Sequence, residues 1–276
     1  MDTDESIRER CPQKIIFYRK HCAAAVYLEN SKQTHWLLVL DADTGVINPA
    51  HCIEDYIDNS KDLIFYERFM NWEVMSGNYL VKNTDFGRRF LHKWADYEFN
   101  APPSWNGYDN GALQILLLET LLPNNKPEHQ MCHDFWNSST SYEEYIAYVM
   151  CCKVALGSRR IWDRIKIFRR AHGFARDASL TRGKWCEKSF FFHGWKGNEV
   201  DQDAWGSPLT RLMAIEECRP QTKWPWRNGT KVPCDQIRDY LAAAEHNSAV
   251  KFPRMAKRLP FLERADVAEC WPNCEH

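Results

Sequence analysis

The sequence contains no apolar run of the ~18–20 residues that are needed to span a bilayer. Its N-terminus is charged and lacks the apolar centre of a secretory signal. Within this chain, these two absences exclude a membrane-spanning segment and a recognisable targeting segment. A membrane anchor is therefore expected only if the gene product extends upstream.

An excess of one sign of charge is also missing. The chain has 36 Lys and Arg against 37 Asp and Glu, which leaves a formal net charge of −1. Such a balance creates no global field that attracts nucleic acid or a membrane surface, so we expect no nucleic-acid partner. Internal repeats and low-complexity tracts are absent too. With 276 residues, 44% of them hydrophobic, the chain is expected to fold as one large globular domain or one and a half.

Paired Cys-x-x-Cys motifs are absent, which argues against a structural zinc ribbon. Cysteine itself is abundant, however, with eleven residues. The Cys270/Cys274 pair and the Cys218/Cys234 pair are candidate disulfides. Because eleven is an odd number, sequence alone leaves the connectivity open.

Two Asn-x-Ser/Thr motifs, at Asn137 and Asn228, point to the same cellular compartment as the cysteines. Such motifs accept glycans only when a chain enters the secretory pathway. An ordinary cytosolic enzyme tends to carry fewer cysteines than this chain. Together these features predict a glycoprotein of the secretory lumen.

Strand-like and helix-like segments alternate along the chain. The predicted strands are residues 36–40, 63–66, 79–81, 165–168 and 189–192, and the predicted helices are residues 15–27, 51–58, 86–97, 109–121, 141–156 and 234–246. Because 36–40 is an uninterrupted apolar run, it is typical of a strand buried on both faces of a largely parallel sheet. The alternation predicts an α/β fold with a mainly parallel sheet. We expect one domain over 1–198 and a Cys-, Trp- and Pro-rich appended region over 199–276.

Asp41 and Asp43 stand where the strand 36–40 opens into a turn. In open α/β sheets, ligands bind outside the carboxyl ends of the strands. Two carboxylates separated by one residue can face the same point and hold a hard divalent cation such as Mn²⁺ or Mg²⁺. Since such cations also take phosphate oxygens as ligands, a nucleoside diphosphate fits this motif.

Phosphatases of the haloacid dehalogenase type use nearly the same string, with the first Asp as nucleophile and the second as general acid and base. Those enzymes complete their magnesium site with a later acidic cluster after another buried strand. The nearest equivalent of that cluster in this sequence is the pair Asp201 and Asp203, which lies in a polar, irregular stretch. This alternative is therefore weaker, although it stays open.

Five segments in order carry a resemblance to a known family. They are Leu38-Val-Leu-Asp41-Ala-Asp43-Thr-Gly-Val-Ile-Asn-Pro49, Ser76-Gly-Asn-Tyr-Leu-Val-Lys-Asn-Thr84, Phe90-Leu-His-Lys-Trp94, Tyr108-Asp-Asn-Gly-Ala-Leu113 and Phe192-His-Gly-Trp-Lys-Gly197. In these segments the chain resembles the GT-A-fold nucleotide-diphospho-sugar transferases. It is most similar to a nematode-expanded family of uncharacterised domains of that fold.

The resemblance implies a Mn²⁺ or Mg²⁺ ion held by Asp41, Asp43 and His193. It further implies donor binding by Gly194 and Lys196, because a glycine lets backbone approach a phosphate and a lysine neutralises it.

By the same resemblance, Gly77, Asn78 and Asn110 line the donor-sugar pocket, and Asp109 is the catalytic residue near the anomeric carbon. Asp is also a favoured N-cap, so Asp109 can equally serve to open the helix 109–121.

The implied activity is transfer of a sugar, with retention, from a UDP- or GDP-linked donor to a glycan or glycoprotein acceptor in the Golgi lumen. Only about 35 residues precede Trp36, so the first nucleotide-binding strands of the fold are expected to be missing from this chain. An inactive or truncated relative that only binds glycans remains an alternative. The tryptophans that could stack on sugars are Trp105, Trp195, Trp205, Trp224 and Trp226.

Overall fold

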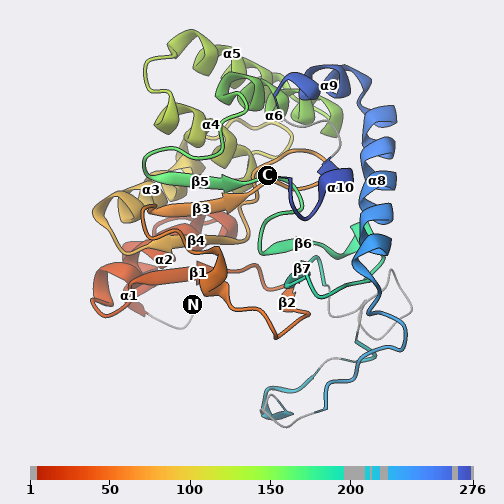
Figure 1. The fold of residues 1–276 in the computed structure, drawn as a ribbon. Helices are drawn as coiled ribbons and strands as arrows, with labels where there is room; N and C mark the ends of the chain where they lie inside the picture. The colour runs from red at the N-terminus through yellow and green to blue at the C-terminus, as the bar shows by residue number, and fades with distance from the viewer. Residues whose placement is uncertain (1–4, 196–208, 212, 218–222, 263–266, 275–276) are drawn as a thin grey trace. The chain divides into compact units, whose positions relative to one another are not determined.

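The structure, a computed structural model, describes residues 5–195, 209–211, 213–217, 223–262 and 267–274 (Figure 1). The chain forms two compact units. The first unit comprises Met1–Leu40, Ile57–Glu67 and Asn71–Arg169, and the second comprises Asp41–Tyr56, Arg68–Met70 and Arg170–His276. The predicted division at 198/199 lies outside the described residues. Residues Asp41–Tyr56 belong to the second unit, where the segment after Leu40 pairs with a strand of the C-terminal half.

The first unit contains four strands and most of the helices. Its strands are β1 (Trp36–Val39), β3 (Leu63–Tyr66), β4 (Tyr79–Lys82) and β5 (Ile165–Phe168). Its helices are α1 (Glu5–Arg10), α2 (Ile16–Asn30), α3 (Asp85–Asp96), α4 (Asp109–Leu121), α5 (Lys126–Ser138) and α6 (Tyr142–Leu156), with a short 3-10 helix η2 (Tyr97–Phe99). The four strands predicted in this part of the chain are confirmed, whereas α1 and α5 were not predicted.

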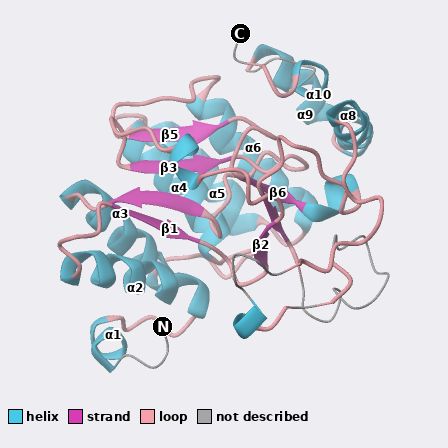
Figure 2. Cartoon of the chain, turned by 60° about the horizontal axis from the view of Figure 1, so that its bottom comes forward, coloured by secondary structure: helices cyan, strands magenta, loops and turns pink. Residues whose placement is uncertain are grey.

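The four strands form one sheet in the order β1-β4-β3-β5 (Figures 1 and 2). β4 runs antiparallel to both β1 and β3, and only β3 and β5 are parallel. The α/β class is confirmed, but the expected mainly parallel sheet is not. β1 lies at the edge and is only partly buried, because β4 enters the sheet between β1 and β3. The prediction from the apolar run 36–40, a strand buried on both faces, is therefore wrong for β1.

Aromatic packing joins the sheet of the first unit to α2 and α3. Trp94 of α3 lies 5.4 Å from Tyr79 of β4 and 6.1 Å from Phe65 of β3, measured between ring centroids. His21 of α2 stacks on the Trp94 ring, with 3.5 Å between the ring centroids. Rings of this size bury large apolar areas, so α2 and α3 are anchored against the sheet.

Two helices of the first unit begin at residues whose side chains cap them. The Thr84 side chain accepts a hydrogen bond from the Gly87 N–H at the start of α3, and Ser141 accepts one from the Glu144 N–H at the start of α6. Each bond satisfies a backbone donor that has no partner within its helix. The helix start predicted at Ser141 is thus confirmed, while the Glu144 carboxylate accepts from the Thr140 N–H.

The second unit is built on a small sheet. Its strands β2 (Thr44–Val46), β6 (Ala175–Asp177) and β7 (Phe191–His193) lie in the order β2-β7-β6. Its α-helices are α8 (Cys234–Lys251), α9 (Pro253–Arg258) and α10 (Val267–Cys270), and its 3-10 helices are η1 (Ile53–Tyr56), η3 (Ala178–Thr181), η5 (Ile215–Glu217) and η6 (Leu259–Phe261). The helix predicted over 51–58 is wrong, since only the single turn η1 forms there. Across the described residues, none of the helices combines the length and the apolar character that crossing a bilayer requires.

Four disulfides connect described cysteines, namely Cys11–Cys22, Cys132–Cys151, Cys186–Cys234 and Cys270–Cys274. The predicted Cys270/Cys274 pair is confirmed. The predicted Cys218/Cys234 pair is wrong, because Cys234 at the start of α8 bonds Cys186. Cys218 lies outside the described residues. Spacing along the chain could not reveal a partner that folding brings from 48 residues away.

Replacing Cys186 and Cys234 by alanine is expected to lower the free energy of unfolding by about 4 kcal/mol, because the disulfide closes a loop of 48 residues. The matched control is replacement of Cys270 and Cys274, whose loop spans 4 residues and whose expected loss is about 2 kcal/mol. Urea unfolding of both variants measures the difference. Equal losses in the two variants would contradict the loop-closure explanation.

Candidate metal centre

The Asp-x-Asp motif forms a tight turn at the start of the second unit. The backbone N–H of Thr44 donates to the carbonyl of Asp41 over 3.0 Å, which closes a β-turn over residues 41–44. Asp41 and Asp43 are the first and third residues of this turn, and β2 begins directly after it. The turn therefore follows β1 closely, as the sequence predicts.

Strand pairing brings His193 to the motif from 150 residues further along the chain. β2 pairs with β7 so that Thr44 lies opposite His193, the last residue of β7. Because Asp43 precedes Thr44, His193 reaches the turn from the neighbouring strand. The predicted set of Asp41, Asp43 and His193 is thus assembled by one antiparallel pairing.

The distances within this set suit a divalent cation. His193 Nε2 lies 3.4 Å from Asp43 Oδ1 and 3.7 Å from Asp41 Oδ2, and one ligand atom from each residue lies within 4.8 Å of the others. Neighbouring ligand atoms around an octahedral ion bound at about 2.1 Å lie about 3.0 Å apart. The two distances from His193 Nε2 exceed this spacing by about 0.4 Å and 0.7 Å. Two carboxylates and one imidazole also match the ligand preferences of Mn²⁺.

A third carboxylate, Asp177, lies behind His193. β6 and β7 are parallel, with Asp177 opposite His193, and the Asp177 Oδ1 is 2.8 Å from His193 Nδ1. Arg68 in turn donates to both oxygens of Asp177, over 3.1 Å from Nε and 3.0 Å from Nη2. The sequence prediction missed Asp177 and Arg68. Neither belongs to a recognisable motif, so nothing local distinguishes them from ordinary surface charges.

These carboxylates make the centre favourable for positive charge. Burial by itself would lower the pKa of His193, but hydrogen bonds to Asp177 and Asp41 raise it to about 9. Burial would likewise raise the pKa of Asp177, yet the charge of Arg68 and the bond to His193 lower it to about 2. The side chain of Asp41 keeps 30% of its surface exposed, so the centre is open to solvent on that side.

Two glycines allow close packing around the centre. Gly194 has a φ of 93°, a backbone conformation that favours glycine, and it turns the chain so that the Trp195 N–H donates to the Asp43 carbonyl over 2.8 Å. The Trp195 ring then covers Gly45, where an added Cβ would lie 2.7 Å from the ring. Predicted donor residue Gly194 therefore adjoins the centre. Predicted donor residue Lys196 lies outside the described residues.

The remaining predicted donor residues lie together in the first unit. The Ser76 hydroxyl donates to Asn110 Oδ1 over 2.5 Å, which places the start of α4 beside the segment of Gly77 and Asn78. The Asn78 side chain is fully buried and donates to the Tyr66 hydroxyl over 2.9 Å. Gly77 is also buried. The structure thus brings Gly77, Asn78 and Asn110 into one neighbourhood.

Asp109, the predicted catalytic residue, is the first residue of α4 and only 4% of its side chain is exposed. Its Oδ2 lies 2.9 Å from Lys20 Nζ and 3.2 Å from His21 Nε2, and its Oδ1 accepts from the Asn110 N–H over 3.0 Å. Burial alone would raise the pKa of Asp109, but the bond to His21 and the charge of Lys20 lower it. Both carboxylate oxygens are therefore engaged inside the first unit. The side chain accepts from Asn110 rather than from the next turn of the helix, so it makes no N-cap bond.

The tryptophans proposed for sugar stacking have different environments. Trp195 and Trp226 pack against the buried cluster of Ile47, Ala178, Trp185 and Phe192. Trp224 stacks on Trp226 at 5.8 Å, Trp105 is exposed in the first unit, and Trp205 lies outside the described residues. Packing therefore accounts for Trp195 and Trp226.

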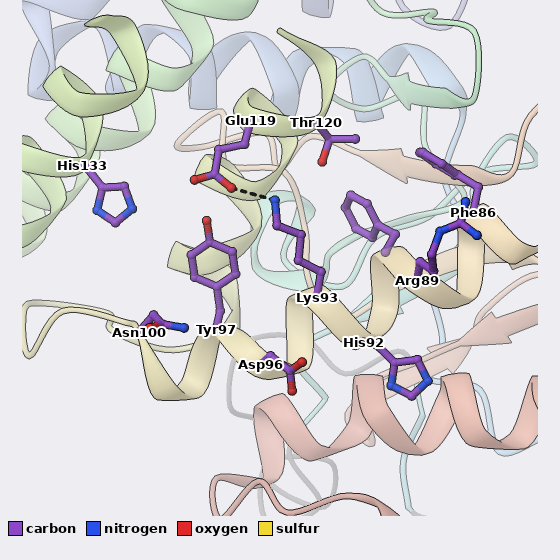
Figure 3. Close-up of a pocket in the computed structure, with 11 residues that line it drawn as sticks. Phe86, Arg89, His92, Lys93, Asp96, Tyr97, Asn100, Glu119, Thr120 and His133 are labelled. Carbon is purple, nitrogen blue, oxygen red and sulfur yellow. Dashed lines mark hydrogen bonds and ion pairs between the residues drawn. The ribbon is translucent and has the colours of Figure 1, made fainter. Parts of the chain in front are cut away.

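Two other features of the described residues resemble sites. Cys186, Glu187 and Cys234 are close enough to share an ion, but the two sulfurs form a disulfide with each other. A pocket of about 800 Å³ lies in the first unit between α3 and α4, and Figure 3 shows Lys93 pointing to Glu119 across it, at 2.9 Å. No predicted site residue lines this pocket. Its central charges neutralise each other, so it offers no strong attraction to an anionic donor.

A family model described as "Protein of unknown function, DUF273" matches residues 2–207, which are 206 of the 276 residues. No curated protein and no solved structure matches the chain. The matched range includes Asp41, Asp43, Asp177 and His193, so the whole centre lies within the part of the chain that the family model matches.

Proposed function

The chain belongs to this family of unknown function, and we propose that it is a metal-dependent glycosyltransferase of GT-A-like fold. The observation that carries the proposal is the convergence of Asp41, Asp43 and His193 on one point. Residues 150 positions apart in sequence supply two oxygens and one nitrogen at distances that suit Mn²⁺ or Mg²⁺. In this proposal the three residues would hold the ion, which would also take phosphate oxygens of the donor as ligands.

The proposed reaction transfers a sugar from a nucleoside diphosphate sugar to a glycan or glycoprotein acceptor. The bond from the anomeric carbon to the diphosphate oxygen breaks, and its electron pair leaves with the diphosphate. An acceptor hydroxyl forms the new bond to the anomeric carbon, and its proton passes to the departing diphosphate. A bound divalent cation supplies neutralisation of the charge that grows on the leaving diphosphate. The carboxylates of Asp41 and Asp43 would hold that cation at the turn over residues 41–44.

The proposal is tested by titration calorimetry with UDP and with GDP, each in the presence and absence of Mn²⁺. We expect nucleotide binding that requires the ion, followed by release of nucleoside diphosphate when a matching nucleotide sugar is supplied. A protein that binds glycans without any Mn²⁺-dependent nucleotide binding would refute the transferase. It would instead support the glycan-binding alternative.

Localisation in the secretory pathway is part of the same proposal. Four disulfides are typical of proteins that fold in an oxidising compartment. Both Asn-x-Ser/Thr motifs have an accessible acceptor, since Asn137 is exposed on α5 and Asn228 is exposed in a turn at Gly229. These observations support a glycoprotein of the Golgi lumen.

When the chain is expressed with a secretion signal in eukaryotic cells, Asn228 is expected to carry an N-linked glycan, because the turn leaves its side chain accessible. Asn228→Gln should reduce the mass by one glycan, as measured by mass spectrometry before and after amidase treatment. Asn59→Gln, at an exposed asparagine outside any such motif, is the control and should leave the mass of the glycans unchanged. An unmodified Asn228 in the secreted protein would contradict the prediction.

A further inference from the structure

We propose that Asp177, held in place by Arg68, is the positioning residue that orients His193 for metal binding. The inference rests on the proposed function, because it concerns the same centre. Asp177 and Arg68 belong to no motif that the sequence revealed. Their role is inferred from the contacts that His193 makes on the side away from Asp41 and Asp43.

The two ring nitrogens of His193 face different partners. Nδ1 lies 2.8 Å from Asp177 Oδ1, while Nε2 faces Asp43 at 3.4 Å and Asp41 at 3.7 Å. Metal binding requires the neutral imidazole, which carries one N–H, and a carboxylate beside Nδ1 accepts that hydrogen. The lone pair is then left on Nε2, toward the two carboxylates. Metal-binding histidines commonly have such a carboxylate behind them, which fixes both the tautomer and the ring orientation.

Backbone pairing brings Asp177 and His193 next to each other. The two residues are direct partners in the parallel pairing of β6 and β7, and each is the last residue of its strand. Each side chain is only 14% exposed. Strand register therefore places the Asp177 carboxylate beside His193 Nδ1.

Arg68 determines how Asp177 presents its oxygens. The guanidinium donates to both of them, over 3.1 Å and 3.0 Å, in the paired geometry that Arg and carboxylates favour. These two hydrogen bonds hold the Asp177 carboxylate so that its Oδ1 lies beside His193 Nδ1. Arg68 also offsets one of the three negative charges that gather around the imidazole, which limits their mutual repulsion. Arg68 belongs to the three-residue segment Arg68–Met70 of the second unit, the same unit as Asp177 and His193.

The experiment compares Mn²⁺ affinity, by calorimetry, in the unmodified chain and in four variants. Asp177→Asn is expected to weaken Mn²⁺ binding by about 10- to 100-fold, the usual effect of removing such an outer partner. Arg68→Met is expected to weaken it by about tenfold, because Asp177 then loses its own support. Asp43→Ala reports on the metal centre itself. Glu245→Gln is the matched control, since it breaks another ion pair of the second unit, Arg170–Glu245 at 3.0 Å.

A second measurement separates orientation from general stability. The ¹⁵N shifts of His193 are recorded by NMR in the Zn²⁺-loaded protein, because Zn²⁺ is diamagnetic. In the unmodified chain we expect a protonated Nδ1 and a metal-bound Nε2. In Asp177→Asn we expect this signature to be lost or mixed with the other tautomer.

Each outcome has a definite meaning. Weak binding in Asp177→Asn and Arg68→Met, with an unchanged Glu245→Gln, supports the proposal. If Asp43→Ala loses Mn²⁺ while Asp177→Asn keeps full affinity and the same tautomer, the positioning role is refuted and the metal centre stands. Equal weakening in Glu245→Gln also refutes the positioning role, since any broken ion pair would then have the same effect. If the unmodified chain binds no Mn²⁺, both the positioning role and the proposed function are refuted.

Discussion

Replacing Asp43 by alanine is expected to lower Mn²⁺ affinity by more than about 100-fold and to abolish Mn²⁺-dependent nucleotide binding and donor hydrolysis. The loss should exceed the 10- to 100-fold effect of removing an outer partner, because Asp43 would contact the ion directly. Its Oδ1 is the carboxylate oxygen closest to His193 Nε2, at 3.4 Å. Calorimetry with Mn²⁺ and UDP measures the first two effects. Release of free sugar from the nucleotide sugar measures the third.

The matched control is Asp55→Ala, which removes an exposed carboxylate from η1 in the same unit. This variant should bind Mn²⁺ and nucleotide as the unmodified chain does. If Asp43→Ala keeps full nucleotide affinity, Asp43 is no metal ligand, and the site assignment must be abandoned. If both variants lose affinity equally, the effect is one of overall charge and not of the turn over residues 41–44.

Replacing Asp109 by alanine is expected to lower the free energy of unfolding by about 3–5 kcal/mol, which is typical when one partner of a buried ion pair is removed. The substitution leaves Lys20 Nζ, His21 Nε2 and the Asn110 N–H without their acceptor, and 96% of the Asp109 side-chain surface is inaccessible to water. His21 is itself fully buried against the Trp94 ring and the Tyr79 hydroxyl, so it cannot turn to solvent. Denaturant unfolding measures the loss.

Asp85→Ala is the control for Asp109→Ala. Asp85 also lies at the start of a helix of the first unit and pairs with an arginine, but 77% of its side chain is exposed. Its replacement should change the unfolding free energy by less than about 1 kcal/mol. The comparison also tests the predicted catalytic role of Asp109. If Asp109→Ala is as stable as the unmodified chain and yet loses transfer activity, Asp109 has a catalytic role, and its contacts with Lys20 and His21 do not stabilise the fold.

The same carboxylate makes stability depend on pH in a definite direction. Because the pKa of Asp109 in the folded chain is lowered, its ionised form contributes stability above the unfolded value of about 3.9. That contribution is lost as the pH falls through the folded pKa. Asp109→Asn should therefore be less stable than the unmodified chain at neutral pH and should lose less stability on acidification. Unfolding measured from pH 7 to pH 2 checks this, and parallel curves for the two proteins over that whole range would contradict it.

Local patterns were sufficient for several elements and for the turn that carries Asp41 and Asp43. The apolar run before Asp41 predicted β1, the Ser141 box predicted the start of α6, and the spacing around Trp94 predicted α3. Asp41 and Asp43 were predictable as a pair because a turn at a strand end can be recognised from adjacent residues alone. His193 was placed with them through a family resemblance, and the strand pairing of β2 with β7 brings it there.

Other features depend on contacts between distant parts of the chain. The antiparallel insertion of β4 between β1 and β3, the Cys186–Cys234 bond, and the division into two units have no local signal. β2 and β6 are strands of three residues each, too short to show a period. Sequence patterns report which residues are apolar and how they alternate, but they do not report which strands become neighbours.

The sequence by itself therefore determined the α/β class, most helices and strands, and a turn with two carboxylates. It could do so because these features follow from the order of adjacent residues. Only the tertiary structure decided that Asp177 and Arg68 stand behind His193, since strand register and a three-residue segment bring them there from distant positions. It also decided that Asp109 is enclosed by Lys20 and His21, because burial and ion pairing depend on packing between helices. The turn at Asp41 could be predicted from the sequence, whereas the residues that surround it were determined by the tertiary structure.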